Sequence, residues 1–385
     1  MVSERARSVE PFIAMDVLER ASGMDDVVHL EVGEPDFDPP EAVFDAAVDS
    51  LRSGNTDYTA ARGKPALRRA IADRYDRVYG VDVDPGRVVV TPGSSPGLLL
   101  AVATLLDPGD ELLLTDPHYA CYPNFVRTVS GEVSTVPLRA SEGFQPRVAD
   151  FEAAMDAGTA TAGLLVNSPA NPTGAVLDGD ALSALVEAAE KRDVTVVADE
   201  IYHGLSYDVT EHTVLEYTDD AFVLDGFSKR YGMTGWRLGW LVVPDWAVDA
   251  VNRLAQNLFI CAPNFVQDAG VAALETDDGD RLDSIRETYR ERRDVLLDAV
   301  ESWGLDAGYT PAGAYYLLVD VSDLPGDSLD VADLFLEEAG VAVTPGVDFG
   351  ERGADYVRLS YATDTESVKE GTRRIERLLA TVDGR

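Results

Sequence analysis

The chain has 385 residues, 45% of them hydrophobic, and its 69 acidic against 32 basic residues give a net charge of −37. This length and apolar content predict a globular protein with a large core and two domains, not a disordered chain. Such an acidic surface repels nucleic acid and anionic membranes, which argues against both as partners. Acid-rich, lysine-poor composition is typical of halophilic proteins, so we expect concentrated salt to screen the self-repulsion.

Two cysteines, Cys121 and Cys261, lie far apart and lack the spacing of metal ligands, so we expect neither a disulfide framework nor a metal site. The first residues, MVSERARSVE, have no apolar core of the kind that a signal peptide needs. The apolar run over 98–106 is too short to span a bilayer. These features predict a soluble cytoplasmic protein.

The N-terminal part of the chain begins with an amphipathic pattern over 11–21, which predicts a helix, and an apolar run over 27–32, which predicts a strand. In the turn EVGEPDFDPP that follows, Gly33 could let a substrate approach the backbone, although a plain loop glycine explains it equally well. The segment YTAARGKPALRRAIADRY leads from a loop into a helix, with Pro65 in the first turn, where its missing N–H costs little. Tyr58, taken alone, would be a surface tyrosine.

A candidate anion site follows the strand predicted over 87–91. The turn PGSSPG joins this strand to the apolar helix predicted over 98–106, and Ser94 and Ser95 lie in the turn. Small residues at a helix N-terminus favour anions because free N–H groups and the helix dipole point the same way. The turn lacks the GK[ST] ending of a nucleotide P-loop, so ATP binding is not expected.

Polar residues also follow the next predicted strands, which cover 111–114, 133–137, 162–166 and 195–198. Tyr119 lies in TDPHYACYP and Asn171 in the rigid turn NSPANPTG, at strand ends where sheets of this type bind ligands. Asp199 comes directly after an apolar strand in DEIYHGL, three residues before Tyr202. A buried carboxylate needs a partner, so Asp199 is a candidate site residue. A helix N-cap role for Asp199 and simple core packing of Tyr119 are the alternatives.

The stretch DGFSKRYGMTGWRLGW, residues 225–240, lies between apolar runs over 221–224 and 238–243 that predict buried strands. Its glycines let the backbone approach a bulky group, and it holds a lysine, Lys229, and a possible anion clamp, Arg237. The chain has only four lysines, at positions 64, 191, 229 and 369. Arginine cannot replace a lysine that must form an imine, because guanidinium is a poor nucleophile. An amine beside an anion clamp suggests a phosphorylated carbonyl cofactor, whereas the alternative is an ordinary solvated lysine.

The segment GFSKRYGMTGWRLG resembles the cofactor-lysine signature of class I and II aminotransferases, the pyridoxal-phosphate enzymes of fold type I. With the upstream turns, the resemblance covers nearly the whole chain. It implies an α/β fold with a large domain, residues 45–285, whose mostly parallel seven-stranded sheet is sandwiched by helices. A smaller α+β domain would comprise both termini, residues 1–44 and 286–385, where we expect helices over 281–302 and 331–339 and strands in AYYLLVDV and YVRLSYAT.

The resemblance further implies transamination between an L-amino acid and a 2-keto acid, with pyridoxal 5′-phosphate as cofactor and ping-pong kinetics. Lys229 would hold the cofactor and then act as general base and acid. Asp199 would keep the pyridine nitrogen protonated, which makes the ring a stronger electron sink. Tyr202 and Asn171 would bind the ring oxygen, and Tyr119 would stack on the ring. The proline bond after Asn171 is commonly cis in such enzymes.

Two anionic groups would be bound by the remaining candidates. The resemblance assigns the cofactor phosphate to Ser94, Ser95, Arg237 and, across a homodimer interface, Tyr58. The substrate would be bound by Gly33 and Asn171 and by Arg358, which clamps its α-carboxylate. Arg358 lies among alternating apolar residues, where an arginine without an anion is costly. A structural salt bridge is the alternative in a chain so rich in carboxylates.

This chain departs from its relatives at two positions. Gly226 stands where several of them place a phosphate-binding serine, and Ser95 stands where some aspartate-using members have a lysine. Arg62 could contact an acidic substrate, although a surface role also explains it. The alternative functions are a carbon–sulfur β-lyase or a cyclopropane-forming synthase on the same fold, and a non-catalytic sensor. The lyases commonly have histidine at the position of Tyr202, and regulators of this fold carry a DNA-binding domain for which we expect no room before Gly33.

Overall fold

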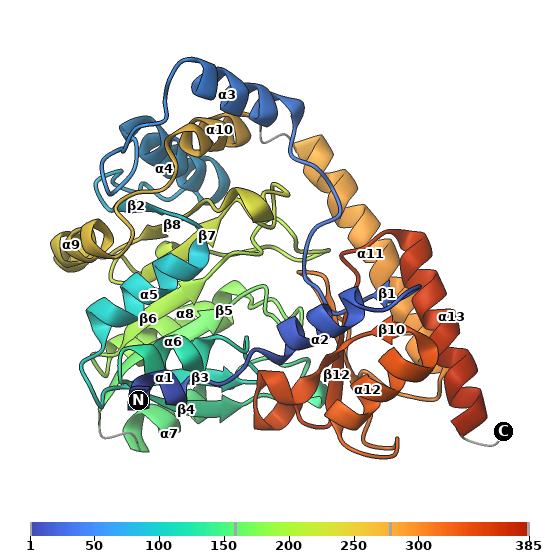
Figure 1. Ribbon diagram of the computed structural model, residues 1–385. Helices are drawn as coiled ribbons and strands as arrows, with labels where there is room; N and C mark the ends of the chain where they lie inside the picture. Colours follow the sequence, from blue (N-terminus) through green and yellow to red (C-terminus); the bar gives the residue numbers. More distant parts are fainter. Residues whose placement is uncertain (1, 158–159, 277–278, 383–385) are drawn as a thin grey trace.

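The structure is a computed structural model that describes residues 2–157, 160–276 and 279–382. Its centre is a sheet of seven strands in the order β2-β8-β7-β6-β5-β3-β4 (Figure 1). β8 runs antiparallel to β2 and β7, and the other neighbours pair in parallel. The strands are β2 (Val88–Thr91), β3 (Glu111–Asp116), β4 (Glu132–Pro137), β5 (Thr161–Asn167), β6 (Thr195–Asp199), β7 (Phe222–Gly226) and β8 (Gly239–Val242).

Helices cover both faces of this sheet because strand residues alternate between two apolar cores. Val88 and Val90 pack into one core and Val89 into the other, as the period of two requires. The first core is closed by α3 (Glu41–Arg52), α4 (Pro65–Tyr79), α7 (Val148–Ala157), α8 (Gly179–Glu190) and α10 (Asn264–Glu275). The second is closed by α5 (Ser94–Leu105), α6 (Tyr122–Thr128) and α9 (Val248–Leu258).

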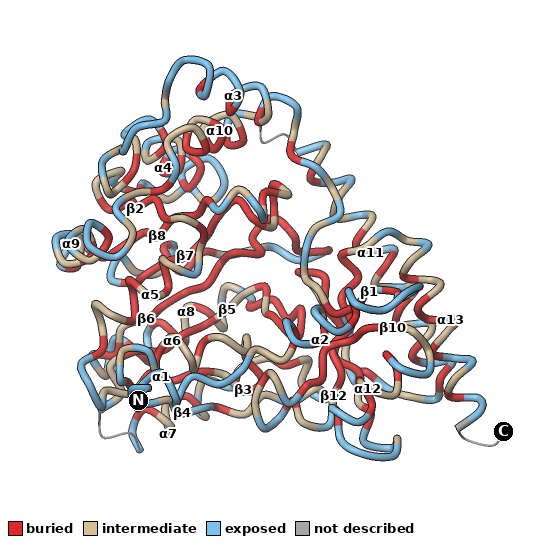
Figure 2. Tube along the Cα trace, viewed as in Figure 1, coloured by how far each residue is buried: buried red, intermediate tan, exposed pale blue. Residues whose placement is uncertain are grey.

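A second body joins the two ends of the chain. β9 (Tyr316–Asp320), β12 (Tyr356–Ser360) and β11 (Thr344–Pro345) form an antiparallel sheet, and β1 (Val28–His29) pairs in parallel with β10 (Val341–Ala342). Their core is closed by α11 (Gly279–Ser302), α12 (Ser328–Ala339) and α13 (Thr365–Val382). Figure 2 shows most strands of the central sheet buried, except at the edge strand β4, while exposed residues lie along the outer helices.

The N-terminal helices and the short 3-10 turns complete the secondary structure. α1 (Glu4–Ser8) lies against α6, and α2 (Ile13–Ser22) lies against β10 and β11. The 3-10 turns are η1 (Ala140–Glu142), η2 (Val214–Glu216), η3 (Thr234–Trp236), η4 (Asp245–Ala247), η5 (Gly346–Phe349) and η6 (Glu351–Gly353). Among the described helices, none combines the length and the apolar character that crossing a bilayer requires.

Two predicted elements differ from the structure. The strand expected over 27–32 is only two residues long, because its pairing changes partner at Leu30. The Leu30 N–H donates to the carbonyl of Ala342 on β10 at 3.0 Å, whereas the Leu30 carbonyl accepts from the N–H of Ser360 on β12 at 2.7 Å. The helix expected over 98–106 begins at Ser94, so both serines belong to its first turn. The backbone reaches that start through Gly93, whose φ of +95° is readily adopted only by glycine.

Candidate active site

The carboxyl ends of the parallel strands meet at one edge of the central sheet, where chain segments of the second body approach. A pocket of about 300 Å³ opens there. It is lined by ten of the eleven candidate residues, namely Gly33, Ser94, Ser95, Tyr119, Asn171, Asp199, Tyr202, Lys229, Arg237 and Arg358. The eleventh, Tyr58, lies outside it with 79% of its surface exposed. Residues distributed over more than 300 positions of sequence thus share one cavity.

Lys229 follows β7 and extends its amine into this pocket. Its Nζ donates a hydrogen bond of 2.5 Å to the carbonyl of Gly33. Burial lowers the pKa of the Lys229 amine to about 8, an effect that the nearby carboxylate of Glu34 opposes. A pKa near neutrality gives the amine a substantial unprotonated fraction, which is the form that attacks carbonyl carbons and accepts protons.

Gly33 is a position where a side chain does not fit. A Cβ built there would overlap the hydroxyl and ring of Tyr316. The Gly33 carbonyl accepts a second hydrogen bond of 3.0 Å from the hydroxyl of Tyr315, so one carbonyl binds both the phenol and the Lys229 amine. The glycine is therefore needed for close approach between the loop and β9.

Asp199 ends β6 with its carboxylate buried. Oδ2 accepts a 2.7 Å hydrogen bond from the Tyr122 hydroxyl, and Oδ1 accepts one of 3.2 Å from the Ile201 N–H. Burial raises the pKa of Asp199, whereas these two bonds and the Lys229 charge lower it. Tyr202 lies beyond Asp199, and its hydroxyl is 2.9 Å from that of Tyr316.

Arg358 lies on β12, buried between the rings of Tyr316 and Phe349, whose centroids are 4.4 and 4.8 Å from its Cζ. Nη1 donates to Oδ1 of Asn171 at 2.9 Å, and Nη2 donates to the carbonyl of Glu31 at 2.5 Å. Nε is buried and has no hydrogen-bond partner. No carboxylate neutralises Arg358 in these hydrogen bonds, so the structural salt bridge considered as an alternative does not explain it. The Asn171–Pro172 bond is cis.

The first turn of α5 and Arg237 meet at one end of the pocket, where they could form an anion cradle. Ser94 and Ser95 line the pocket, and the Arg237 guanidinium lies so close to Gly93 that a Cβ at the glycine would overlap it. Arg237 itself has a left-handed φ of +55°, and its Nη1 donates to the carbonyl of Thr234 at 2.8 Å. Free N–H groups, the helix dipole and a guanidinium at one place suit a phosphate.

Gly226 lies behind the cradle in the tightly packed part of β7. A Cβ there would lie 3.1 Å from Cα of Gly239 and 3.2 Å from Cδ1 of Ile201, so a larger residue would crowd the next strand. Ser228, beside the lysine, does line the pocket. Arg62 is not among the lining residues, and its Nη1 donates to the carbonyl of Gly86 at 2.7 Å. This contact fits the surface role.

The lining also includes residues that were absent from the candidates taken from the sequence, among them Phe12, Tyr122, Ser228 and Tyr316. Tyr122 follows Tyr119 by three residues in a segment already singled out, and the need of Asp199 for a hydrogen-bond donor was the signal that could have identified it. Tyr316 contacts Tyr202 across 114 positions of sequence, and no local pattern indicates such a pair. Phe12 packs edge-on against Tyr119, with ring centroids 5.9 Å apart.

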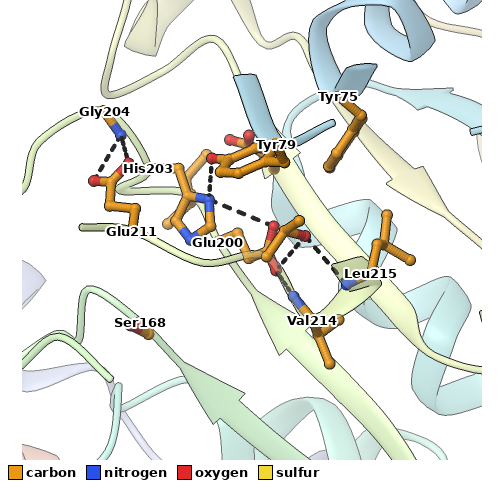
Figure 3. A network of polar contacts seen from close by, with 12 residues as sticks. Tyr75, Tyr79, Ser168, Glu200, His203, Gly204, Glu211, Val214 and Leu215 are labelled. Atoms are coloured by element: carbon orange, nitrogen blue, oxygen red, sulfur yellow. Dashed lines mark hydrogen bonds and ion pairs between the residues drawn. The ribbon is translucent and has the colours of Figure 1, made fainter. Parts of the chain in front are cut away.

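A buried polar network surrounds Glu200 and His203, which follow Asp199 in the chain (Figure 3). Nδ1 of His203 lies 2.6 Å from the Tyr79 hydroxyl and 3.5 Å from the Glu200 carboxylate. Glu200 in turn accepts 2.9 Å hydrogen bonds from Thr213 Oγ1 and the next backbone N–H. Burial lowers the pKa of His203 to about 4, so its ring is neutral at pH 7. The network anchors the chain directly after Asp199.

The pocket residues fit pyridoxal 5′-phosphate. An amine with a lowered pKa faces a carboxylate that could pair with a pyridinium, and a phosphate cradle lies at the adjoining strand end. The unpartnered Nε of Arg358 leaves a donor for a further anionic group. Within the described residues, no group of three or more His, Cys, Asp or Glu could hold a metal ion.

Comparison with known proteins agrees with this chemistry. The family model "Aminotransferase class I and II" matches residues 25–375. The chain is 39% identical to a valine–pyruvate aminotransferase of Mycobacterium tuberculosis over 95% of this chain and 96% of that protein. It is 37% identical to an aspartate/prephenate aminotransferase of Thermus thermophilus over 98% of both.

A solved structure extends the likeness to three dimensions. The Thermus thermophilus aspartate aminotransferase with maleate superimposes with a TM-score of 0.94 at 36% identity, covering 98% of this chain and 99% of that one. A family match over nearly the whole chain and a shared fold of this quality establish membership. The chain belongs to the class I and II aminotransferases, fold type I enzymes that use pyridoxal phosphate to move an amino group between an amino acid and a 2-keto acid.

Proposed function

We propose that Lys229, Asp199 and Arg358 are the residues around which this transaminase binds its cofactor and substrate. The observation that carries the proposal is the Lys229 amine, whose pKa burial lowers to about 8, inside the pocket that Asp199 and Arg358 also line. When bound, pyridoxal 5′-phosphate supplies an aldehyde for the lysine and an electron-withdrawing ring. Lys229 would then serve as general base and acid, accepting and returning a proton at the substrate α-carbon.

The other residues orient these groups. The Asp199 carboxylate would hold a proton on the pyridine nitrogen, and Tyr202 and Asn171 would donate to the ring oxygen. Tyr119 offers a ring face for stacking. Arg358 grips the α-carboxylate of the substrate, with the Gly33 backbone on the other side.

The cofactor phosphate is proposed to rest on Ser94, Ser95 and Arg237. We propose a homodimer in which the partner's Tyr58 completes this cradle. The support is the exposure of Tyr58, 79% of whose surface is free in the single chain, together with the open side of the cradle at Arg237, itself exposed. Sedimentation should give twice the chain mass of 41.5 kDa.

The cellular setting and the domain limits are also proposals. A cytoplasmic enzyme adapted to high salt is supported by the net charge of −37. A large domain over 45–285 and a small domain over 1–44 and 286–385 are supported by the separate apolar cores. α11 crosses the proposed limit at residue 285, so this helix connects the two domains.

Lys229→Ala is the decisive variant. It should lose both the visible absorbance of bound cofactor and more than about 10³-fold of the transamination rate, because general acid–base work alone contributes about 10²–10⁴-fold. Lys191→Ala, at an exposed lysine directly after the last residue of α8, is the matched control and should retain activity. Assay of products distinguishes the rival chemistry, since pyruvate and ammonia from a cysteine conjugate would indicate a β-lyase.

A further inference from the structure

This inference rests on the proposed function, which assigns every cationic side chain that lines the pocket to the cofactor or to the substrate α-carboxylate. Lys229, Arg237 and Arg358 are the cations among its lining residues, and the proposal uses them for the aldehyde, the phosphate and the α-carboxylate. The lining of the described chain therefore offers no further cation to a second carboxylate on the substrate side chain. The side-chain subsite must be built from the remaining walls.

One wall is the N-terminal segment, which is fastened to both bodies of the molecule. Asn124 on α6 accepts from the Glu10 N–H at 2.9 Å and donates to the Glu10 carbonyl at 3.1 Å. At the other end, the Asp348 carboxylate accepts from the N–H groups of Ile13 and Ala14, both at 3.1 Å. The residues between these anchors are thereby held across the pocket.

The segment presents apolar side chains to the pocket. Phe12, Ala14 and Met15 line it. Phe12 meets the edge of Tyr119, the ring proposed to stack on the cofactor, with centroids 5.9 Å apart. Met15 remains 52% exposed, so apolar surface is available to a ligand. Burying such surface against an aliphatic or aromatic side chain is favourable.

A carboxylate beside the pocket opposes an acidic side chain. Glu34 accepts a hydrogen bond from Thr234 Oγ1, which lines the pocket, and its charge raises the pKa of Lys229 against the larger effect of burial. Glu31 also belongs to the lining, but its buried carboxylate lies 2.7 Å from Nδ1 of His29, so Glu34 is the carboxylate that opposes an acidic ligand. A like charge beside the pocket disfavours a second substrate carboxylate.

We propose that the amino donor of this enzyme carries a neutral, apolar side chain, and that the matching keto acid is a monocarboxylate. Selection has two sources. Phe12 and Met15 offer apolar contact, and the carboxylate of Glu34 repels acidic side chains.

The test compares L-leucine with L-aspartate, whose side chains branch at the same atom and differ mainly in charge. Single turnovers of the holoenzyme, followed through loss of the cofactor absorbance, should favour leucine by about 10²-fold, the order expected for burying an unpaired charge. A ratio of about ten or less, or a preference for aspartate, would overturn the proposal while leaving transamination intact. Failure of every amino acid to react would refute the proposed function, and this inference with it.

Two arginine variants test the location of the subsite. Phe12→Arg places a cation in the apolar wall and should shift the leucine-to-aspartate ratio toward aspartate by at least about tenfold. Val9→Arg adds the same charge to the same segment at an exposed residue outside the lining, and it should leave the ratio unchanged. Equal shifts in the two variants would show that general electrostatics, not the Phe12 wall, sets the preference.

Discussion

The hydroxyl of Tyr122 donates a 2.7 Å hydrogen bond to Oδ2 of Asp199, and both groups are buried. Because this bond lowers the pKa of a carboxyl that burial raises, Tyr122 helps to keep Asp199 ionised. Tyr122 is thus a positioning residue that acts through Asp199.

Tyr122→Phe should lower kcat/KM by about 10–100-fold, as expected for a hydrogen bond to a charged group. The loss should shrink as the pH rises, because deprotonation of Asp199 no longer depends on the phenol. A pH profile of kcat/KM checks this. Tyr217→Phe, far from the pocket, is the control, and a loss that is independent of pH would contradict the assigned role.

The lowered pKa of Lys229 predicts how cofactor capture depends on pH. Only the neutral amine attacks an aldehyde, and burial lowers the pKa of the Lys229 amine from its ordinary value of 10.5 to about 8. The rate at which the cofactor-free chain captures pyridoxal phosphate should therefore rise with pH and level off above about 8. Stopped-flow absorbance measures this rate. A midpoint near that of a free lysine would show that burial does not control the amine.

Gly33→Ala should damage the substrate site. The added Cβ would overlap Tyr316, so the loop that binds the Lys229 amine must shift. We expect kcat/KM to fall by about 10²-fold, the scale of a 1 Å misplacement near the chemistry.

Gly235→Ala is the matched control for this prediction, because a Cβ at Gly235 meets nothing within 4 Å. It should leave kcat/KM within about twofold of the wild type, as surface substitutions away from special features usually do. If the two alanine variants behaved alike, the close approach at Gly33 would not matter.

Arg74 and Asp225 form a fully buried ion pair in which Nη1 and Oδ2 are 3.4 Å apart. Burial raises the pKa of Asp225 to about 7, against the lowering effect of Arg74. Arg74→Met removes that cation and should cost about 3–5 kcal/mol of unfolding free energy at pH 8.

The cost should be smaller at pH 5, where Asp225 is protonated in the native state and carries no unpaired charge. The sign follows from linkage. The pKa of Asp225 is about 7 in the folded protein and 3.8 in the unfolded chain, so between these pH values the folded state binds more protons. The free energy of unfolding therefore falls as the pH rises from about 4 to about 7. The double variant Arg74→Met, Asp225→Asn should recover most of the loss in urea titrations. No recovery would mean that Arg74 acts through packing on its aromatic neighbours.

Salt should stabilise the protein. With a net charge of −37, self-repulsion of the folded chain is strong at low ionic strength, and counterions screen it. Thermal unfolding midpoints should rise with KCl into the molar range. Midpoints that stay flat between low and molar salt would count against adaptation to salt.

Much of this architecture was predictable because its signals are local. Alternation of apolar residues located most strands of the central sheet, and turn residues at strand ends identified Asn171 and Asp199. The segment around Lys229 carries the signature of the family to which the chain belongs. These features depend on neighbours in sequence, which is why pattern and composition suffice.

Contacts between distant segments were not predictable in this way. The antiparallel insertion of β8 between β2 and β7, the Tyr202–Tyr316 pair and the Phe12 wall bring together residues separated by long stretches of chain. Their energies arise only after the chain closes large loops, so no window of sequence encodes them. The sequence alone determined the cofactor chemistry through its lysine segment, whereas long-range packing determined which donor supports Asp199 and which side chains face the substrate.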